Sequence, residues 1–188
     1  MIKKLVLSLL PLWVIGCNTT RQENIAPDYK AIGDSLSQHT FQKLSGTLKE
    51  KIASSGFPGA VVYCNTEAEK ITNSLAGETI SIERTSLKPR NERNSPDSIE
   101  KEILDYFQEK FSNGDSLAPI LKTDKAGNTH YFKPIMLQPL CLGCHGVPEK
   151  EIAIPTMQAI ASKYPNDPAT GYQAGDLRGA WHIIFSKK

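Results

Sequence analysis

Two cysteines and a histidine at fixed spacing give this chain its clearest chemical signal. Cys141, Cys144 and His145 form the pattern C-x-x-C-H in a sequence of 188 residues. Two thiols at this spacing can add to the vinyl groups of one porphyrin, and the adjacent histidine then reaches the iron as proximal ligand. The motif therefore predicts one covalently attached haem c. A redox dithiol would not need the histidine, and a zinc site would need a second Cys/His pair, which does not follow at the usual spacing.

The first residues of the chain predict export. Two lysines precede an apolar run over residues 5–15, which is shorter than the roughly 20 residues that span a membrane. The run ends at Gly16-Cys17, which resembles a bacterial lipobox. We therefore expect residues 1–16 to be a lipoprotein signal peptide and Cys17 to carry lipid, anchoring the protein on the periplasmic side of a bacterial membrane. Ordinary secretion with Cys17 as a spare thiol is the alternative.

The remaining cysteine also calls for an explanation. The chain has four cysteines, and lipid and haem would use three, which leaves Cys64. An unpaired thiol in an exported protein is either a buried core residue or a reactive group. We consider it as a ligand on the open face of the haem iron. The competing distal ligands are His39, His130, His182, Met136 and Met157.

Composition limits the classes of partner. The formal net charge is +2, and two of the basic residues belong to the signal peptide, so the mature chain is near neutral. This balance gives no reason to expect nucleic-acid binding. Residues 17–28 are polar and predict a tether, whereas residues 29–188 are long enough for one domain with a sizeable core. The sequence has no kinase or methyl-accepting region, so any signal must pass to another protein.

The hydrophobic pattern predicts a mixture of helices and strands. Residues 29–54 have helical periodicity, which Gly56-Phe57-Pro58-Gly59 should end. Residues 60–75 are ambiguous, because Val61 and Val62 favour a strand and the later residues favour a helix beginning near Cys64. Residues 79–85 alternate as a half-buried strand does.

The second half of the chain repeats this mixture. Asp97 and Glu100 form a capping-box pattern at the start of a helix that Asn113-Gly114 should end. Residues 118–121 and 129–137 flank a turn and predict a hairpin. A short helix is expected over 156–164 and a strand over 177–185. A classical cytochrome c differs, since its haem motif lies near the mature N-terminus.

Three blocks of sequence resemble a known family. They are residues 83–97, residues 139–146 and residues 167–180, and together they resemble the single-haem c-type sensor family. The resemblance implies an α+β domain with a PAS-like antiparallel sheet, flanking helices and a long N-terminal helix. It also implies that the segment ending at Cys64 supplies the sixth haem ligand. The chain departs from the family at Asn91-Glu92-Arg93-Asn94, where we would expect a proline.

This resemblance suggests a sensor of redox state or of a small gas such as NO or CO. A thiolate ligand stabilises ferric iron and lowers the potential, and it can leave on reduction or protonation. A monohaem electron-transfer cytochrome is the alternative, with an unknown redox or signalling protein as partner. We do not expect an enzyme, because no acid/base pair can be placed beside the open face of the haem.

Three arginines are candidate partners of the haem propionates. A guanidinium can bind a carboxylate with two hydrogen bonds, and Arg84 is the first choice for this role. Arg90 and Arg178 are weaker candidates for the same role. Each of the three could instead be an ordinary solvated charge.

Overall fold

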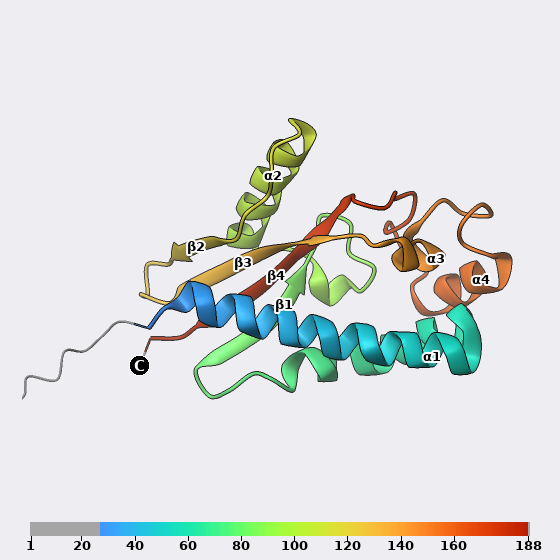
Figure 1. Cartoon of the computed structure of the whole chain (residues 1–188), viewed down its shortest axis with the longest axis horizontal. Helices are drawn as coiled ribbons and strands as arrows, with labels where there is room; N and C mark the ends of the chain where they lie inside the picture. Colours follow the sequence, from blue (N-terminus) through green and yellow to red (C-terminus); the bar gives the residue numbers. More distant parts are fainter. Residues whose placement is uncertain (1–26, 188) are drawn as a thin grey trace, which may run out of the picture.

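The computed structural model describes residues 27–187, which form an α+β fold (Figure 1). The elements in order are α1 (Tyr29–Asn73), β1 (Ile80–Thr85), η1 (Glu92–Asn94), α2 (Ser98–Ser112), β2 (Ile120–Thr123), β3 (Thr129–Met136), η2 (Pro139–Cys141), α3 (Leu142–His145), α4 (Ile154–Lys163) and β4 (Leu177–Phe185). The predicted signal peptide and Cys17 lie outside the described residues. Within the described part, no helix combines the length and the apolar character needed to cross a membrane.

The four strands form one antiparallel sheet in the order β1-β4-β3-β2. Successive side chains of a strand point to opposite faces, so β3 and β4 supply both layers of the core. Tyr131 and Ile183 pack under α1 on one face, whereas Phe132 and Ala180 pack under α2 on the other. The PAS-like α+β fold with a long N-terminal helix is therefore confirmed.

Helix α1 is a helical hairpin. Gly56 has a φ of 66° and a non-helical ψ, which breaks the helix before Pro58. Residues without a glycine's freedom rarely adopt this positive φ. The two stretches run back along each other, since Lys43 donates to the hydroxyl of Ser74 at 2.9 Å. The predicted end of the first helix is thus confirmed.

The strand alternative at Val61 and Val62 is wrong, because both residues are helical and the second stretch begins well before Cys64. Local β-propensity is overridden by tertiary packing here. Val61 is buried, and it packs against Ile152 and Ile160 of the α4 region.

The other predicted elements are confirmed with small shifts of their ends. The capping box is present: the amide of Glu100 donates to Asp97 Oδ1 at 2.7 Å, and the amide of Asp97 donates to Glu100 Oε2 at 2.9 Å. Strands β2 and β3 form the expected hairpin. Helix α4 begins two residues before its predicted start, and β4 has the predicted bounds.

Candidate functional site

The C-x-x-C-H motif lies where the chain leaves β3, at the end of the sheet that also holds α4 and the bend of α1 (Figure 1). Residues 139–145 turn through η2 into the single turn of α3. The loop that precedes β4 runs beside this turn, because the amide of Tyr172 donates to the carbonyl of His145 at 3.0 Å. The amide of Gly171 donates to the carbonyl of Gly146 at 2.8 Å. Motif and loop are therefore held as one unit.

The imidazole of His145 is fixed in one tautomer. Its Nδ1 lies 2.8 Å from the carbonyl oxygen of Ala169, and a carbonyl can only accept, so Nδ1 carries the hydrogen. Burial, together with Arg90 and Arg178, holds the pKa of His145 well below its usual range. The ring is thus neutral at neutral pH, and Nε2 keeps a free lone pair. This is the state in which a histidine binds a metal.

A buried ion pair supports this arrangement. Arg90 and Asp167 lie 2.8 Å apart, with side chains 12% and 5% exposed. The guanidinium also donates to the carbonyl of Cys144 at 2.6 Å and to that of Ala169 at 3.1 Å. Arg90 therefore positions the haem motif through its Nε and one of its two terminal nitrogens. The sequence did not reveal this role, although Arg90 and Asp167 both lie in the blocks that carried the resemblance.

Three free cysteines lie in this region: Cys64, Cys141 and Cys144. Burial raises the pKa of Cys144 to about 11, with Arg90 opposing the rise and the neighbouring Cys64 adding to it. Burial also raises the pKa of Cys64, against the opposing charges of Arg84 and Arg90. The second stretch of α1, which carries Cys64, packs at the motif, since Val61 and Cys144 belong to one apolar cluster.

Arg84 lies on the face of the sheet that α1 covers, next to Cys64. Its guanidinium is 6.0 Å from the ring of Trp181. Burial lowers the pKa of Arg84, and Cys64 is the strongest of the groups that oppose this fall. Its Nε is buried and has no hydrogen-bond partner among the residues that the structure describes. A buried donor without an acceptor is costly, so this position suits an anionic group.

The second residue between the motif cysteines must be small. A Cβ at Gly143 would overlap the ring of Phe57, which begins the second stretch of α1. This close approach joins the motif to the helix that carries Cys64. This contact could not be predicted from the sequence, because Phe57 and Gly143 are far apart along the chain.

The structure separates the other candidate distal ligands. His39 is exposed on α1, and Met136 is 39% exposed at the end of β3. His130 and His182 bond to each other at 2.8 Å on the α2 face of the sheet. Met157 packs against the same apolar cluster as Cys144. Cys64 and Met157 are therefore the candidates that the fold brings to the motif.

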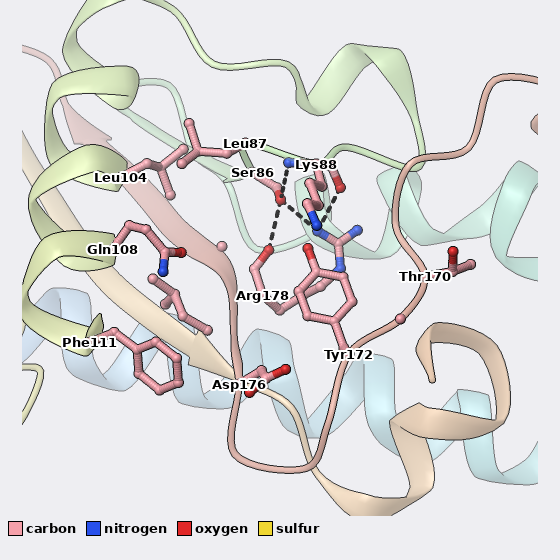
Figure 2. A pocket seen from close by; sticks show the side chains of 13 residues that line it. Ser86, Leu87, Lys88, Leu104, Gln108, Phe111, Thr170, Tyr172, Asp176 and Arg178 are labelled. Carbon is pink, nitrogen blue, oxygen red and sulfur yellow. Dashed lines mark hydrogen bonds between the residues drawn. The ribbon is translucent and has the colours of Figure 1, made fainter. Parts of the chain in front are cut away.

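A cavity of about 460 Å³ adjoins the site (Figure 2). Tyr172 lies in its wall and touches the ring of His145 edge-on, with centroids 6.4 Å apart. Lys88 and Arg178 lie over the Tyr172 ring at 5.5 and 5.6 Å. Arg178 also donates to the hydroxyl of Ser86 at 2.6 Å. The wall nearest His145 is thus positively charged.

Comparison with known proteins agrees with this combination of fold and site. The family described as Tll0287-like matches residues 18–186. The chain belongs to this family, which confirms the resemblance read from the sequence. A crystal structure titled as the cyanobacterial heme-protein Tll0287 superimposes with a TM-score of 0.66 and 25% identity, covering 87% of this chain and 98% of that one. No curated protein matches the sequence.

Proposed function

We propose that this protein is an exported, lipid-anchored haem-c protein that senses redox state or a small gas. The observation that carries the proposal is the state of His145, whose Nδ1–H is bound to Ala169 and whose Nε2 lone pair is free. In the sequence, His145 comes directly after Cys144, and Cys141 and Cys144 are free thiols at the spacing of haem attachment. The family match to a heme-protein supports the same cofactor.

The residues at this site fit a covalently bound haem. Cys141 and Cys144 would form the thioether bonds, and His145 would be the proximal ligand. The unpartnered Nε of Arg84 would bind a propionate, since a carboxylate provides the acceptor that this buried donor lacks. When bound, haem c would supply an iron that changes oxidation state and can accept a further ligand.

Cys64 is proposed as this further ligand of the iron. Its surroundings favour opposite states: burial favours the neutral thiol, and the charges of Arg84 and Arg90 favour the thiolate. Cys64 would hold the iron as a thiolate. As a neutral thiol it would be a weaker ligand, which would leave the iron open to NO or CO.

Lipid on Cys17 would hold the protein at the periplasmic side of a bacterial membrane. The signal would pass to a separate redox or signalling protein, and no residue is assigned a catalytic role. A monohaem electron carrier is the competing function, in which both iron ligands stay bound in both oxidation states.

Absorption spectra of the haem-loaded protein test the proposal, in ferric and ferrous form and with and without CO or NO. We expect a low-spin thiolate spectrum in the ferric wild type and gas binding after reduction. Cys64→Ala should keep the haem, shift the ferric spectrum, raise the midpoint potential and speed CO binding.

Met157→Leu is the matched control and should leave the spectrum unchanged. A Soret band and potential unaffected by Cys64→Ala would contradict the Cys64 assignment. A spectrum that changes in Met157→Leu instead would identify Met157 as the ligand. A wild-type haem that refuses CO would favour the electron carrier.

A further inference from the structure

Four titratable side chains form a hydrogen-bonded chain on the face of the sheet that α2 covers, away from the haem motif. His182 Nδ1 lies 2.8 Å from Glu100 Oε1, and His182 Nε2 lies 2.8 Å from His130 Nδ1. His130 Nε2 then lies 3.3 Å from Asp124 Oδ2. Glu100, His130 and His182 are buried, with exposed fractions of 5%, 6% and 1%.

The number of protons in this chain does not match the number of contacts. Each of the three contacts needs one hydrogen between its two heavy atoms. Two neutral imidazoles bring two hydrogens, and ionised carboxylates bring none. If His182 donates to Glu100 and His130 donates to His182, the lone pair of His130 Nε2 faces the carboxylate of Asp124. With both imidazoles neutral, one contact is left with two acceptors, and it needs either a third hydrogen or a cation in place of one.

A third carboxylate, that of Glu83, lies beside the end of the hydrogen-bonded series at which His182 meets Glu100. Glu83 of β1 is the cross-strand partner of His182 on β4, and it is exposed to solvent. Ligand atoms of Glu83, Glu100 and His182 all lie within 4.8 Å of one another. We propose that these three residues bind one divalent cation, with zinc as the best match to a set of one imidazole and two carboxylates.

A cation at this position removes the mismatch. An ion on His182 Nδ1 replaces the hydrogen there, so His182 carries its hydrogen on Nε2 and donates it to His130 Nδ1. His130 then carries its own hydrogen on Nε2 and donates it to Asp124. The His182–His130 and His130–Asp124 contacts then have one hydrogen each, and the ion takes the place of the hydrogen between His182 and Glu100. Metal-binding histidines commonly have such a partner on the second ring nitrogen.

The ligands are already oriented for this role. The capping box holds Glu100 Oε2 against the amide of Asp97, which leaves Oε1 for the ion. The ring of Phe132 stacks on His182 with centroids 4.2 Å apart, which fixes the imidazole plane. Zinc bonds of about 2.0 Å place tetrahedral ligand atoms about 3.3 Å apart, so only small movements are needed. Glu83 gives the ion a route from solvent.

Calorimetric titration of the haem-loaded full-length protein with Zn²⁺ tests this site. We expect one ion per chain. Glu83→Gln should weaken binding at least tenfold, and Asp124→Asn about tenfold through the outer contact. Neither change removes buried apolar volume, so both variants should fold.

Glu109→Gln is the control, since Glu109 is an exposed carboxylate on α2, the helix that carries Glu100. The Glu109→Gln variant should bind Zn²⁺ like the wild type. Wild-type protein that takes up no Zn²⁺ would overturn the proposal. Binding that is unchanged in Glu83→Gln and Asp124→Asn would also overturn it, as would binding that is lost in His39→Gln instead.

Discussion

Arg90 and Asp167 form an ion pair that joins the loop after β1 to the loop before β4. The pair is 2.8 Å long and almost fully buried. Both partners also bind backbone: Arg90 donates to the carbonyl of Cys144 at 2.6 Å, and Asp167 accepts from the amide of Ala169 at 2.9 Å. The pair therefore fixes both the carbonyl beside the motif thiol and the segment that orients His145.

Removing the guanidinium should cost much stability. Arg90→Ala leaves Asp167 as a buried charge without its partner, and breaking such a pair typically costs roughly 3–5 kcal/mol. Urea unfolding of the haem-loaded protein measures the loss. Arg93→Ala is the control, because its pair with Glu69 is exposed and should contribute under about 1 kcal/mol. Equal losses in both variants would show that Arg90 has no special structural role.

Covalent attachment predicts a simple extraction result. The colour of the wild-type protein should stay with the polypeptide in acidified acetone, because thioether bonds to Cys141 and Cys144 do not dissociate. The double variant Cys141→Ser/Cys144→Ser should release its haem or fail to acquire it. Cys64→Ser should keep its colour. Wild-type haem that passes into the solvent would refute the c-type assignment.

If Cys17 carries lipid, replacing this cysteine should move the protein out of the membrane fraction. Cys17→Ala in the full-length protein should abolish membrane association or leave the precursor uncleaved, since the acyl chains have no attachment site. Fractionation of the expressing cells and the mass of the mature protein measure both effects. Cys64→Ala should remain in the membrane fraction. A normally processed, membrane-bound Cys17→Ala protein would exclude the lipid anchor.

Asp34 of α1 predicts a specific acid dependence. Its Oδ1 accepts from the hydroxyl of Tyr131 at 2.7 Å and from Lys133 Nζ at 3.1 Å. The Tyr131 hydrogen bond, with further help from Lys30 and Lys133, lowers the pKa of Asp34 to about 2. The carboxylate therefore stabilises the fold fully above its unfolded pKa of 3.8, and this contribution is lost as the pH falls towards about 2.

Thermal unfolding from pH 5 to pH 2 tests this dependence. The melting temperature of the wild type should exceed that of Asp34→Asn at pH 5, and the difference should shrink towards pH 2. Asp105→Asn, which removes an exposed carboxylate of a surface pair, should show a much smaller difference at pH 5. A gap between wild type and Asp34→Asn that stays constant over the range would rule out the ionised contact.

Local signals predicted much of the fold. The capping box of Asp97 and Glu100 located the start of α2, and alternation of apolar residues located β4. Val61 and Val62 misled, because β-branched residues favour strands unless tertiary packing decides otherwise. Packing of the hairpin against α4 could not be read from residues 57–73 alone.

Some residues of the candidate site could be predicted from the sequence, and others could not. Cys141, Cys144 and His145 are neighbours in sequence, so their spacing identified them. Cys64 required a count of cysteines and a family resemblance. Arg90 and Asp167 were missed as a pair, since their contact joins residues 77 positions apart. The chain from Glu100 to Asp124 was missed because it needs the sheet register that pairs β3 with β4.

The bend at Gly56 also determines how long the first stretch of α1 is. The first stretch of α1, residues 29–55, rises about 1.5 Å per residue and is therefore about 40 Å long. Figure 1 shows the N-terminal end of this helix at the end of the molecule opposite α3 and α4. If Cys17 holds the chain to a membrane, this helix would act as a spacer between the membrane and the end of the molecule that holds α3 and α4. The haem end would then be accessible to partners in the surrounding compartment, beyond the crowded layer at the lipid surface.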